Sequence, residues 1–254
     1  MLRSRLSVFL MIHKGNLYKS ENFKDYTYIG DPINAVRIYN EFEVDELILV
    51  DVDASVLEKD PKFDLIGKVA SESRMPLCYG GGVKNLFHVE NIINSGVEKI
   101  SLSSEAIYNP DFIKSTSNLV GSQSTSCCVD IKKAGNNYSA YTHNGTKKVN
   151  MKLKDILDSF VENGAGEIII NNIDRDGTLL GFDQELIKET IDEFDIPFTF
   201  VGGAKNLENN YEILKQFGVL GLAGGRIFSL YGDRKSVLLN YPEITERDKF
   251  LKIK

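Results

Sequence analysis

The sequence predicts an α/β protein, a (β/α)8 barrel of the TIM type with parallel strands, and three observations lead to that prediction. Short apolar runs bounded by Gly, Pro, Asp or Asn recur along the chain, helical patterns lie between them, and one half of the sequence repeats the other. Apolar strands that alternate with helices are typical of a parallel sheet covered by helices. A doubly wound open sheet would show the same local patterns, so the repeat decides between the two folds.

Eight strands are expected from the apolar runs, at residues 6–11, 47–51, 77–79, 99–103, 126–130, 167–171, 198–201 and 221–223. The intervening segments carry apolar residues at helical spacing, as in residues 33–42, 86–95 and 153–163. Strand and helix therefore alternate as a barrel requires.

The internal repeat has an offset of 121 residues (197 minus 76), close to half of the chain. Residues 76–86 (PLCYGGGVKNL) match residues 197–207 (PFTFVGGAKNL), and the same shift places residues 46–49 (ELIL) on residues 167–170 (EIII). Two similar halves of four βα units each make one eightfold barrel with a pseudo-twofold axis.

Composition predicts a soluble globular protein. The chain has 254 residues and a formal net charge of −6, with 42% hydrophobic and 26% charged residues. That length suits one barrel, so we expect a single domain over residues 1–254. The negative charge argues against nucleic acid as a partner. We expect no membrane contact, because no apolar run approaches the ~20 residues of a spanning helix and the N-terminal apolar run is too short for a signal peptide.

Cysteine and histidine usage points to no metal or redox site. Cys78, Cys127 and Cys128 lack CxxC spacing, which fits a reducing cytoplasm and structural roles. The three histidines have no ligand spacing. We expect a surface role for His13, with ligand contact as the less favoured alternative, because it lies two residues after Met11. No cofactor is implied.

Glycines, two serines and one aspartate follow the expected strands at the end where barrel active sites lie. They are Gly81, Gly82, Ser103 and Ser104 in the first half and Asp176, Gly177, Gly202, Gly203, Gly224 and Gly225 in the second. Glycine lets backbone N–H groups approach an anion closely. The duplicated turns therefore predict two phosphate sites and a phosphorylated small-molecule ligand. The alternative is that these glycines only make tight turns.

Two carboxylates and a lysine are expected at the same end. Asp130 ends the fifth strand and is a candidate general acid or base or ligand contact, with a capped structural carboxylate as the less favoured alternative. Asp51 ends the second strand. Lys19 is expected in the loop after strand one, either folded over a substrate or simply solvated.

Over residues 1–228 the sequence resembles the cyclase subunit of imidazole glycerol phosphate synthase (HisF). The motifs that resemble it are residues 5–19, 31–32, 45–47, 51–55, 80–82, 121–123, 164–167, 173–178 (IDRDGT) and 202–204. The resemblance implies that a glutaminase (HisH-like) subunit supplies ammonia through the barrel to a bisphosphorylated ribonucleotide. It also implies two catalytic aspartates, at the ends of strands one and five.

Only one of those aspartates is present. Asp130 matches the strand-five position, whereas Met11 occupies the strand-one position. A thioether cannot transfer a proton, and losing one acid or base group costs ~10²–10⁴ in rate. The family's Asn-Thr pair after strand four is replaced by Ser103 and Ser104, and its strand-six threonine and strand-eight serine by Asn171 and Gly225. We therefore expect cyclase activity to be reduced by that order or lost, and the substrate to be changed.

Four charged residues immediately precede or begin strands at the opposite end of the barrel, namely Arg5, Glu46, Lys99 and Glu167. Charges at strand starts are ordinarily solvated. The resemblance instead implies that they form the family's ammonia gate, on the face where the glutaminase docks.

Three functions remain open. HisF-like chains without the strand-one aspartate resemble paralogs from surface-polysaccharide (lipopolysaccharide) gene clusters, thought to deliver ammonia to a separate sugar amidotransferase that amidates an acetamido sugar. The second function is a working cyclase of histidine biosynthesis. The third is a non-catalytic scaffold that activates the glutaminase.

Overall fold

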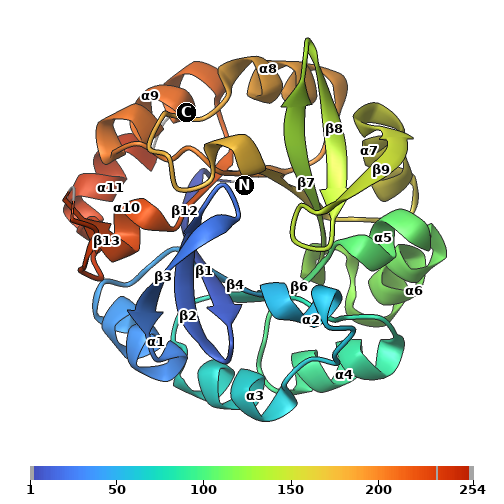
Figure 1. Ribbon diagram of the computed structural model, residues 1–254, viewed down its shortest axis with the longest axis horizontal. Coiled ribbons are helices and arrows are strands. Elements are labelled where there is room, and N and C mark those ends of the chain that lie inside the picture. Colours follow the sequence, from blue (N-terminus) through green and yellow to red (C-terminus); the bar gives the residue numbers. More distant parts are fainter. Residues whose placement is uncertain (1–2, 233, 252–254) are drawn as a thin grey trace.

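The computed structural model describes residues 3–232 and 234–251. Eight parallel strands close into a barrel, each hydrogen-bonded to the next and the last to the first (Figure 1). They are β1 (Arg5–His13), β4 (Glu46–Asp51), β5 (Leu77–Gly80), β6 (Lys99–Leu102), β7 (Thr125–Ala134), β10 (Glu167–Asn172), β11 (Phe198–Val201) and β12 (Gly221–Gly224). The predicted barrel is confirmed, and the open sheet is excluded by the pairing of β12 with β1.

Helices surround the barrel (Figure 1). They are α1 (Pro32–Glu41), α2 (Val52–Val56), α3 (Phe63–Glu72), α4 (Leu86–Asn94), α5 (Ser104–Tyr108), α6 (Pro110–Val120), α7 (Leu153–Glu162), α8 (Gln184–Glu193), α9 (Leu207–Phe217), α10 (Arg226–Ser229) and α11 (Ile244–Leu251). Equivalent caps start α4 and α9: the side chains of Asn85 and Asn206, 121 residues apart, accept hydrogen bonds from the backbone N–H groups of His88 and Asn209.

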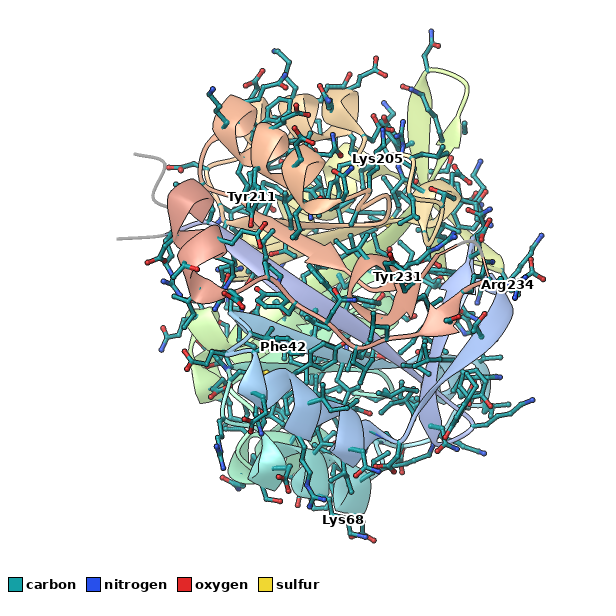
Figure 2. The ribbon with its side chains drawn as sticks, turned by 90° about the vertical axis from the view of Figure 1, so that its left-hand side faces the viewer. Phe42, Lys68, Lys205, Tyr211, Tyr231 and Arg234 are labelled. Atoms are coloured by element: carbon teal, nitrogen blue, oxygen red, sulfur yellow. The ribbon has the colours of Figure 1, made fainter. Side chains whose placement is uncertain are left out.

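Three β-hairpins were not predicted. They are formed by β2 (Asn16–Glu21) with β3 (Lys24–Gly30), by β8 (Asn137–Thr142) with β9 (Lys147–Lys152), and by β13 (Leu230–Tyr231) with β14 (Ser236–Val237). The first two extend β1 and β7 beyond the barrel. In the side view of Figure 2, Arg234, between β13 and β14, marks this end of the barrel, which we call the mouth.

Successive side chains along a strand point to opposite faces, so alternate residues face the barrel axis. Inside the barrel they form a separate apolar cluster of Phe9, Ile48, Cys78, Ile169, Val201 and Ala223. The larger core lies between strands and helices and includes Cys127. Cys127 and Cys128 therefore face opposite sides of β7, and all three cysteines are free thiols.

Within the described ranges, no helix is both long and apolar enough to cross a bilayer. That residues 1–254 form one domain stays a prediction, and residues 1–2, 233 and 252–254 lie outside the described part of the chain.

Candidate functional site

Asp130 lies at the mouth beside a neighbouring amide. The side chain of Asn171 donates a hydrogen bond from Nδ2 to Asp130 Oδ1 at 3.0 Å. Burial raises the pKa of Asp130 to about 7, although the hydrogen bond from Asn171 opposes that rise. A carboxyl group with that pKa can exchange a proton near neutral pH, as a general acid or base must.

Met11 shares a cavity of about 80 Å³ with Asp130. The side chain of Met11 is buried, and the hydroxyl of Ser20 approaches its sulfur at 3.8 Å. Neither the thioether of Met11 nor the hydroxyl of Ser20 can transfer protons as a carboxylate can. Asp51, Ser103, Ser104, Gly81 and Asn171 line the same cavity, so the structure brings these predicted residues together with Asp130.

Lys19 does not lie in a loop, so that expectation was wrong. It belongs to β2, and its side chain is buried in an ion pair with Asp176. The hairpin is the physical reason, because β2 pairs back along β1 and turns Lys19 inward. A Cβ atom on Gly225 would lie 2.8 Å from Lys19 Cδ, so the glycine leaves room for this lysine.

The glycine turns fit closely against neighbouring backbone. A Cβ atom on Gly81 would lie 2.4 Å from the carbonyl oxygen of Asp51, and one on Gly202 would lie 2.4 Å from that of Asn172. Both glycines have positive φ, at 114° and 92°. Only glycine fits these positions, so the tight turn by itself accounts for these residues, and phosphate binding remains a prediction.

Two side cavities adjoin the turns. One of about 230 Å³ is lined by Gly81, Gly82, Ser103 and Ser104. The other, of about 10 Å³, is lined by Lys19, Asp176, Gly177, Gly202, Gly203, Gly224 and Gly225. The predicted glycine, serine and charged residues are thus divided between two cavities at the mouth.

Asp51 forms an ion pair with Lys62, in which its Oδ2 lies 3.3 Å from Lys62 Nζ, and its side chain also caps α2.

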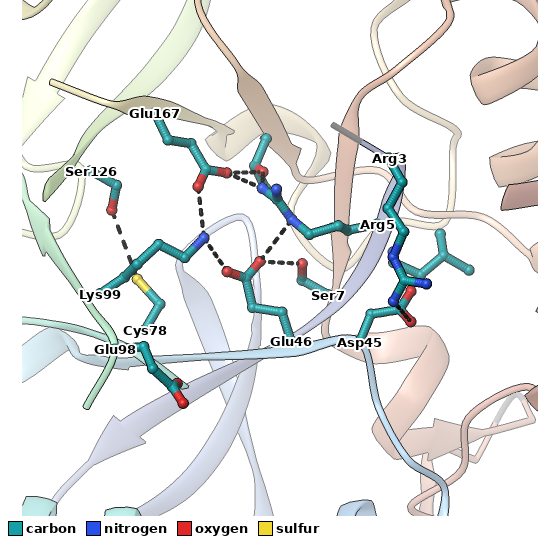
Figure 3. A network of polar contacts seen from close by, with 12 residues as sticks. Arg3, Arg5, Ser7, Asp45, Glu46, Cys78, Glu98, Lys99, Ser126 and Glu167 are labelled. Atoms are coloured by element: carbon teal, nitrogen blue, oxygen red, sulfur yellow. Dashed lines mark hydrogen bonds and ion pairs between the residues drawn. The ribbon is translucent and has the colours of Figure 1, made fainter. Parts of the chain in front are cut away.

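The four charged residues at the opposite end form an ion ring, which we define as Arg5, Glu46, Lys99 and Glu167 (Figure 3). Lys99 Nζ lies 2.7 Å from Glu167 Oε2 and also pairs with Glu46. Arg5 pairs with Glu167, and its Nε lies 3.4 Å from Glu46 Oε2. Each cation therefore bridges both carboxylates, so these side chains are not the solvated strand ends that charges usually make.

Electrostatics keep the ion ring charged although it is buried. Burial alone would raise the pKa of Glu167, but Lys99 and Arg5 outweigh it and hold that pKa below its usual value. Two hydroxyls complete the network, since Ser7 Oγ donates to Glu46 Oε2 at 2.8 Å and Thr199 Oγ1 donates to Glu167. Sequence reasoning missed both hydroxyls, which the alternation of β1 and β11 could have placed on the barrel axis.

Sequence reasoning also missed a contact between two hairpins above the mouth. The amide of Asn144, after β8, donates to the hydroxyl of Tyr26, in β3, at 2.7 Å. The ring of Tyr26 stacks on His13 with 4.5 Å between centroids, and His13 Nδ1 lies 2.6 Å from an oxygen of Asp53. His13 is therefore part of a packed cluster rather than a free surface residue. No sequence pattern predicted this contact between the two hairpins.

No group of three or more potential metal ligands occurs in the described part of the chain.

Comparison with known proteins places this architecture in one family. Residues 10–233 match the family model described as histidine biosynthesis protein. The chain is 45% identical over 250 residues to a Leptospira borgpetersenii protein named as an imidazole glycerol phosphate synthase subunit HisF, covering 98% of each chain. It is 38% identical to a similarly named Pseudomonas aeruginosa protein, covering 98% of this chain and 99% of that one. The HisF subunit of Exiguobacterium sibiricum is 34% identical, covering 85% and 86%. The chain therefore belongs to the histidine biosynthesis protein family and is HisF-like.

Proposed function

We propose that this chain is the ammonia-receiving subunit of a glutamine amidotransferase complex, in which a HisH-like glutaminase supplies ammonia for amidation of an acetamido sugar by a separate enzyme. One observation carries the proposal. The ion ring is complete, with both anions bridged by both cations, while the mouth has Met11 where a second catalytic carboxylate would stand.

The ion ring suits control of a small neutral molecule. Lys99 bridges Glu46 and Glu167 across the axis, so its side chain must move before anything enters. Removing one partner from a buried ion pair costs about 3–5 kcal/mol, and a docking partner that offers replacement contacts would lower that cost. Relatives named as subunits of a synthase support the existence of a partner subunit.

The layer above the ring selects for neutral ammonia. It contains the side chains of Phe9, Ile48, Ile169 and Val201. An unpaired charge is strongly disfavoured in such surroundings, so ammonium ion would be excluded while ammonia could pass. A barrel that keeps this arrangement delivers unprotonated ammonia to its mouth.

The mouth itself is poorly equipped to form an imidazole ring. Ring formation in the family uses two carboxylates, and here Asp130 stands opposite the thioether of Met11. One residual group with a pKa of about 7 can move one proton. Ammonia that reaches the mouth is therefore better used by a second enzyme, and the cyclase of histidine biosynthesis remains the alternative function.

The proposal can be tested by tracing the side-chain amide nitrogen of glutamine into the sugar product. The chain is co-purified with its glutaminase and given glutamine labelled with ¹⁵N in the side-chain amide, an acetamido sugar nucleotide and the amidating enzyme encoded beside it. We expect ¹⁵N in the amidated sugar even with excess unlabelled ammonium in solution. Label found only in free ammonium would instead favour the scaffold function.

A second arm tests the alternative. The chain is assayed with the bisphosphorylated ribonucleotide and ammonium salts, without any glutaminase. Turnover equal to that of a cyclase with both aspartates would show that Met11 does not impair cyclase activity, and it would contradict the proposal.

A further inference from the structure

The hairpin of β8 and β9 is strongly basic in a chain that is otherwise acidic. Residues 131–154, which include the hairpin, contain six lysines and no aspartate or glutamate. Because the whole chain has a formal net charge of −6 and this segment has +6, the remaining residues carry −12. The positive charge is therefore concentrated on one extension of the barrel, which projects between α7 and α8 (Figure 1).

Three of the six lysines are held by the rest of the protein. Lys133 and Lys154 form ion pairs with two carboxylates of α8. Lys132 donates a hydrogen bond to the carbonyl oxygen of Gly145 at 2.9 Å. These three side chains therefore have partners that fix them in place.

The other three, Lys147, Lys148 and Lys152, are exposed on β9, and none of them pairs with a carboxylate in the described part of the chain. β9 is the last strand in the pairing order, and five of its six residues are exposed. The nearest aromatic contact is that of Lys147, whose Nζ lies 5.5 Å from the ring centroid of Tyr108. The charges on β9 are thus uncompensated within the protein, and an anionic partner would be attracted to them.

Strand pairing places Lys148 and Lys152 on one face of the hairpin. Lys148 pairs with Tyr141 and Lys152 with Ser139, and Tyr141 pairs in turn with Asp130 of β7. Side chains of residues that lie opposite each other in antiparallel strands share a face of the sheet. The two lysines therefore share the face that leads to Asp130 and the mouth, and we call Lys148 and Lys152 the basic face.

A groove beside β9 offers apolar contacts next to these charges. It has a volume of about 710 Å³ and is lined by the hairpin, α7 and α8, with the two lysines of the basic face in its lining. Val149, Met151 and Phe194 contribute apolar surface to it, and Met151 is 42% exposed. Methionine is enriched in contacts between proteins. A protein side chain can fill such a groove, whereas a flat lipid surface would leave it empty.

We infer that the basic face and its groove dock the separate amidating enzyme through an acidic surface of that enzyme. The inference rests on the proposed function for the identity of the partner. An enzyme bound here would lie beside the mouth, where ammonia leaves the barrel, and the contact would exclude water from the transfer. A second copy of this chain is a poor occupant, because a twofold contact would bring the same lysines together.

The test measures association and dissociation rates of the full chain, bound to its glutaminase, with the purified amidating enzyme by biolayer interferometry. Lys148→Glu with Lys152→Glu should slow association by about tenfold or more at low salt, because complementary charges steer the encounter. The difference should nearly vanish at about 1 M salt, where the screening length is about 3 Å. The control pair is Lys68→Glu with Lys114→Glu, which changes the net charge equally on exposed lysines of α3 and α6. Equal slowing by both pairs would refute the assignment, as would a natural chain that does not bind the enzyme.

Met151→Gln isolates the groove. It should raise the dissociation rate by about threefold or more and leave the association rate unchanged, because apolar contacts act only after the encounter. Ile38→Gln is the control, since Ile38 on α1 is also 42% exposed. An unchanged dissociation rate in Met151→Gln would overturn the assignment of the groove.

Vesicles of phosphatidylglycerol test the other kind of anionic surface. Sedimentation of the natural chain with them, but not of the double lysine variant, would show that the basic face binds lipid and would overturn the inference. The nitrogen-tracing experiment separates the two proposals. If ¹⁵N reaches the sugar but both lysine pairs behave alike, only the docking surface is wrong; if the enzyme binds through the basic face but receives no label, only the proposed function fails.

Discussion

Asn171 in β10 donates a hydrogen bond to Asp130 in β7, and the two residues are direct neighbours in the parallel pairing of these strands. Burial raises the pKa of Asp130, and the bond from Asn171 opposes that effect because it stabilises the ionised carboxylate. Asn171 therefore lowers the proton affinity of the carboxylate that shares the mouth cavity with Met11.

Replacing Asn171 by alanine should raise the pKa of Asp130 above its value of about 7. The variant removes the hydrogen bond and leaves the carboxylate buried. The pKa can be followed by NMR titration of ¹³C-labelled aspartate carboxyl groups. Asn109→Ala is the control, since that exposed amide bonds Glu105 instead. A pKa that stays constant or falls would contradict this account.

Asp130 should also make stability depend on pH. Its folded pKa of about 7 lies above the ordinary value of 3.8, so the protonated form favours folding. This contribution is fully present below pH 3.8 and is lost as pH rises through 7. The free energy of unfolding of the natural chain, relative to Asp130→Asn, should therefore fall from pH 4 to pH 7 and then level off. Urea unfolding at several pH values checks this, and a difference that does not vary with pH would be the contrary result.

Met11→Asp should restore cyclase chemistry. The side chain lies in the same cavity as Asp130, so a carboxylate there would supply the second proton-transfer group. Regaining such a group is worth about 10²–10⁴ in rate, measured with the bisphosphorylated ribonucleotide and ammonium salts. Met11→Leu, similar in volume but without a titratable group, should show no gain. A gain below about tenfold would mean that the other substitutions at the mouth also block the reaction.

The barrel was predictable because every barrel strand carries its own local signal. Apolar runs, helical spacing and the 121-residue repeat agreed with one another, and Asn85 and Asn206 cap equivalent helices as the repeat requires. The ion-ring residues were found from their places at the starts of strands, and only the resemblance to HisF implied that they act together at one end of the barrel.

The hairpins escaped prediction because their signals are weaker. The segment containing Lys19 mixes charged and aromatic residues. Its first turn has positive φ at Lys14 and Gly15, and its second has positive φ at Asn22 and Phe23 and contains no glycine that would mark it in the sequence. The pairing of Tyr26 with Asn144 joins residues 118 positions apart. Such a contact follows from how the barrel places two loops at one end, which no local pattern encodes.

Glu167→Gln should destabilise the fold and open the ion ring. It leaves Arg5 and Lys99 to share the single remaining carboxylate of Glu46. Breaking a buried pair in this way costs about 3–5 kcal/mol, measurable by urea unfolding. In the complex, more glutamine-derived ammonia should escape into solution. Glu185→Gln breaks the exposed pair with Lys133 and should cost far less, because solvent screens that pair. Equal losses from both variants would show that the ring contributes no more than a surface pair.

Gly202→Ala should be much more harmful than Gly218→Ala, although both glycines have positive φ, at 92° and 84°. A side chain at either position suffers the backbone strain of a positive φ, which costs about 1–3 kcal/mol. At Gly202 the added Cβ would also lie 2.4 Å from the carbonyl oxygen of Asn172, whereas at Gly218 no heavy atom lies within 4 Å. Relieving that overlap by moving the backbone should add about 1–3 kcal/mol. Thermal unfolding of the two variants separates the terms: similar losses would mean that the turn at the mouth can shift freely, and then its close fit against β10 could not be what demands glycine there.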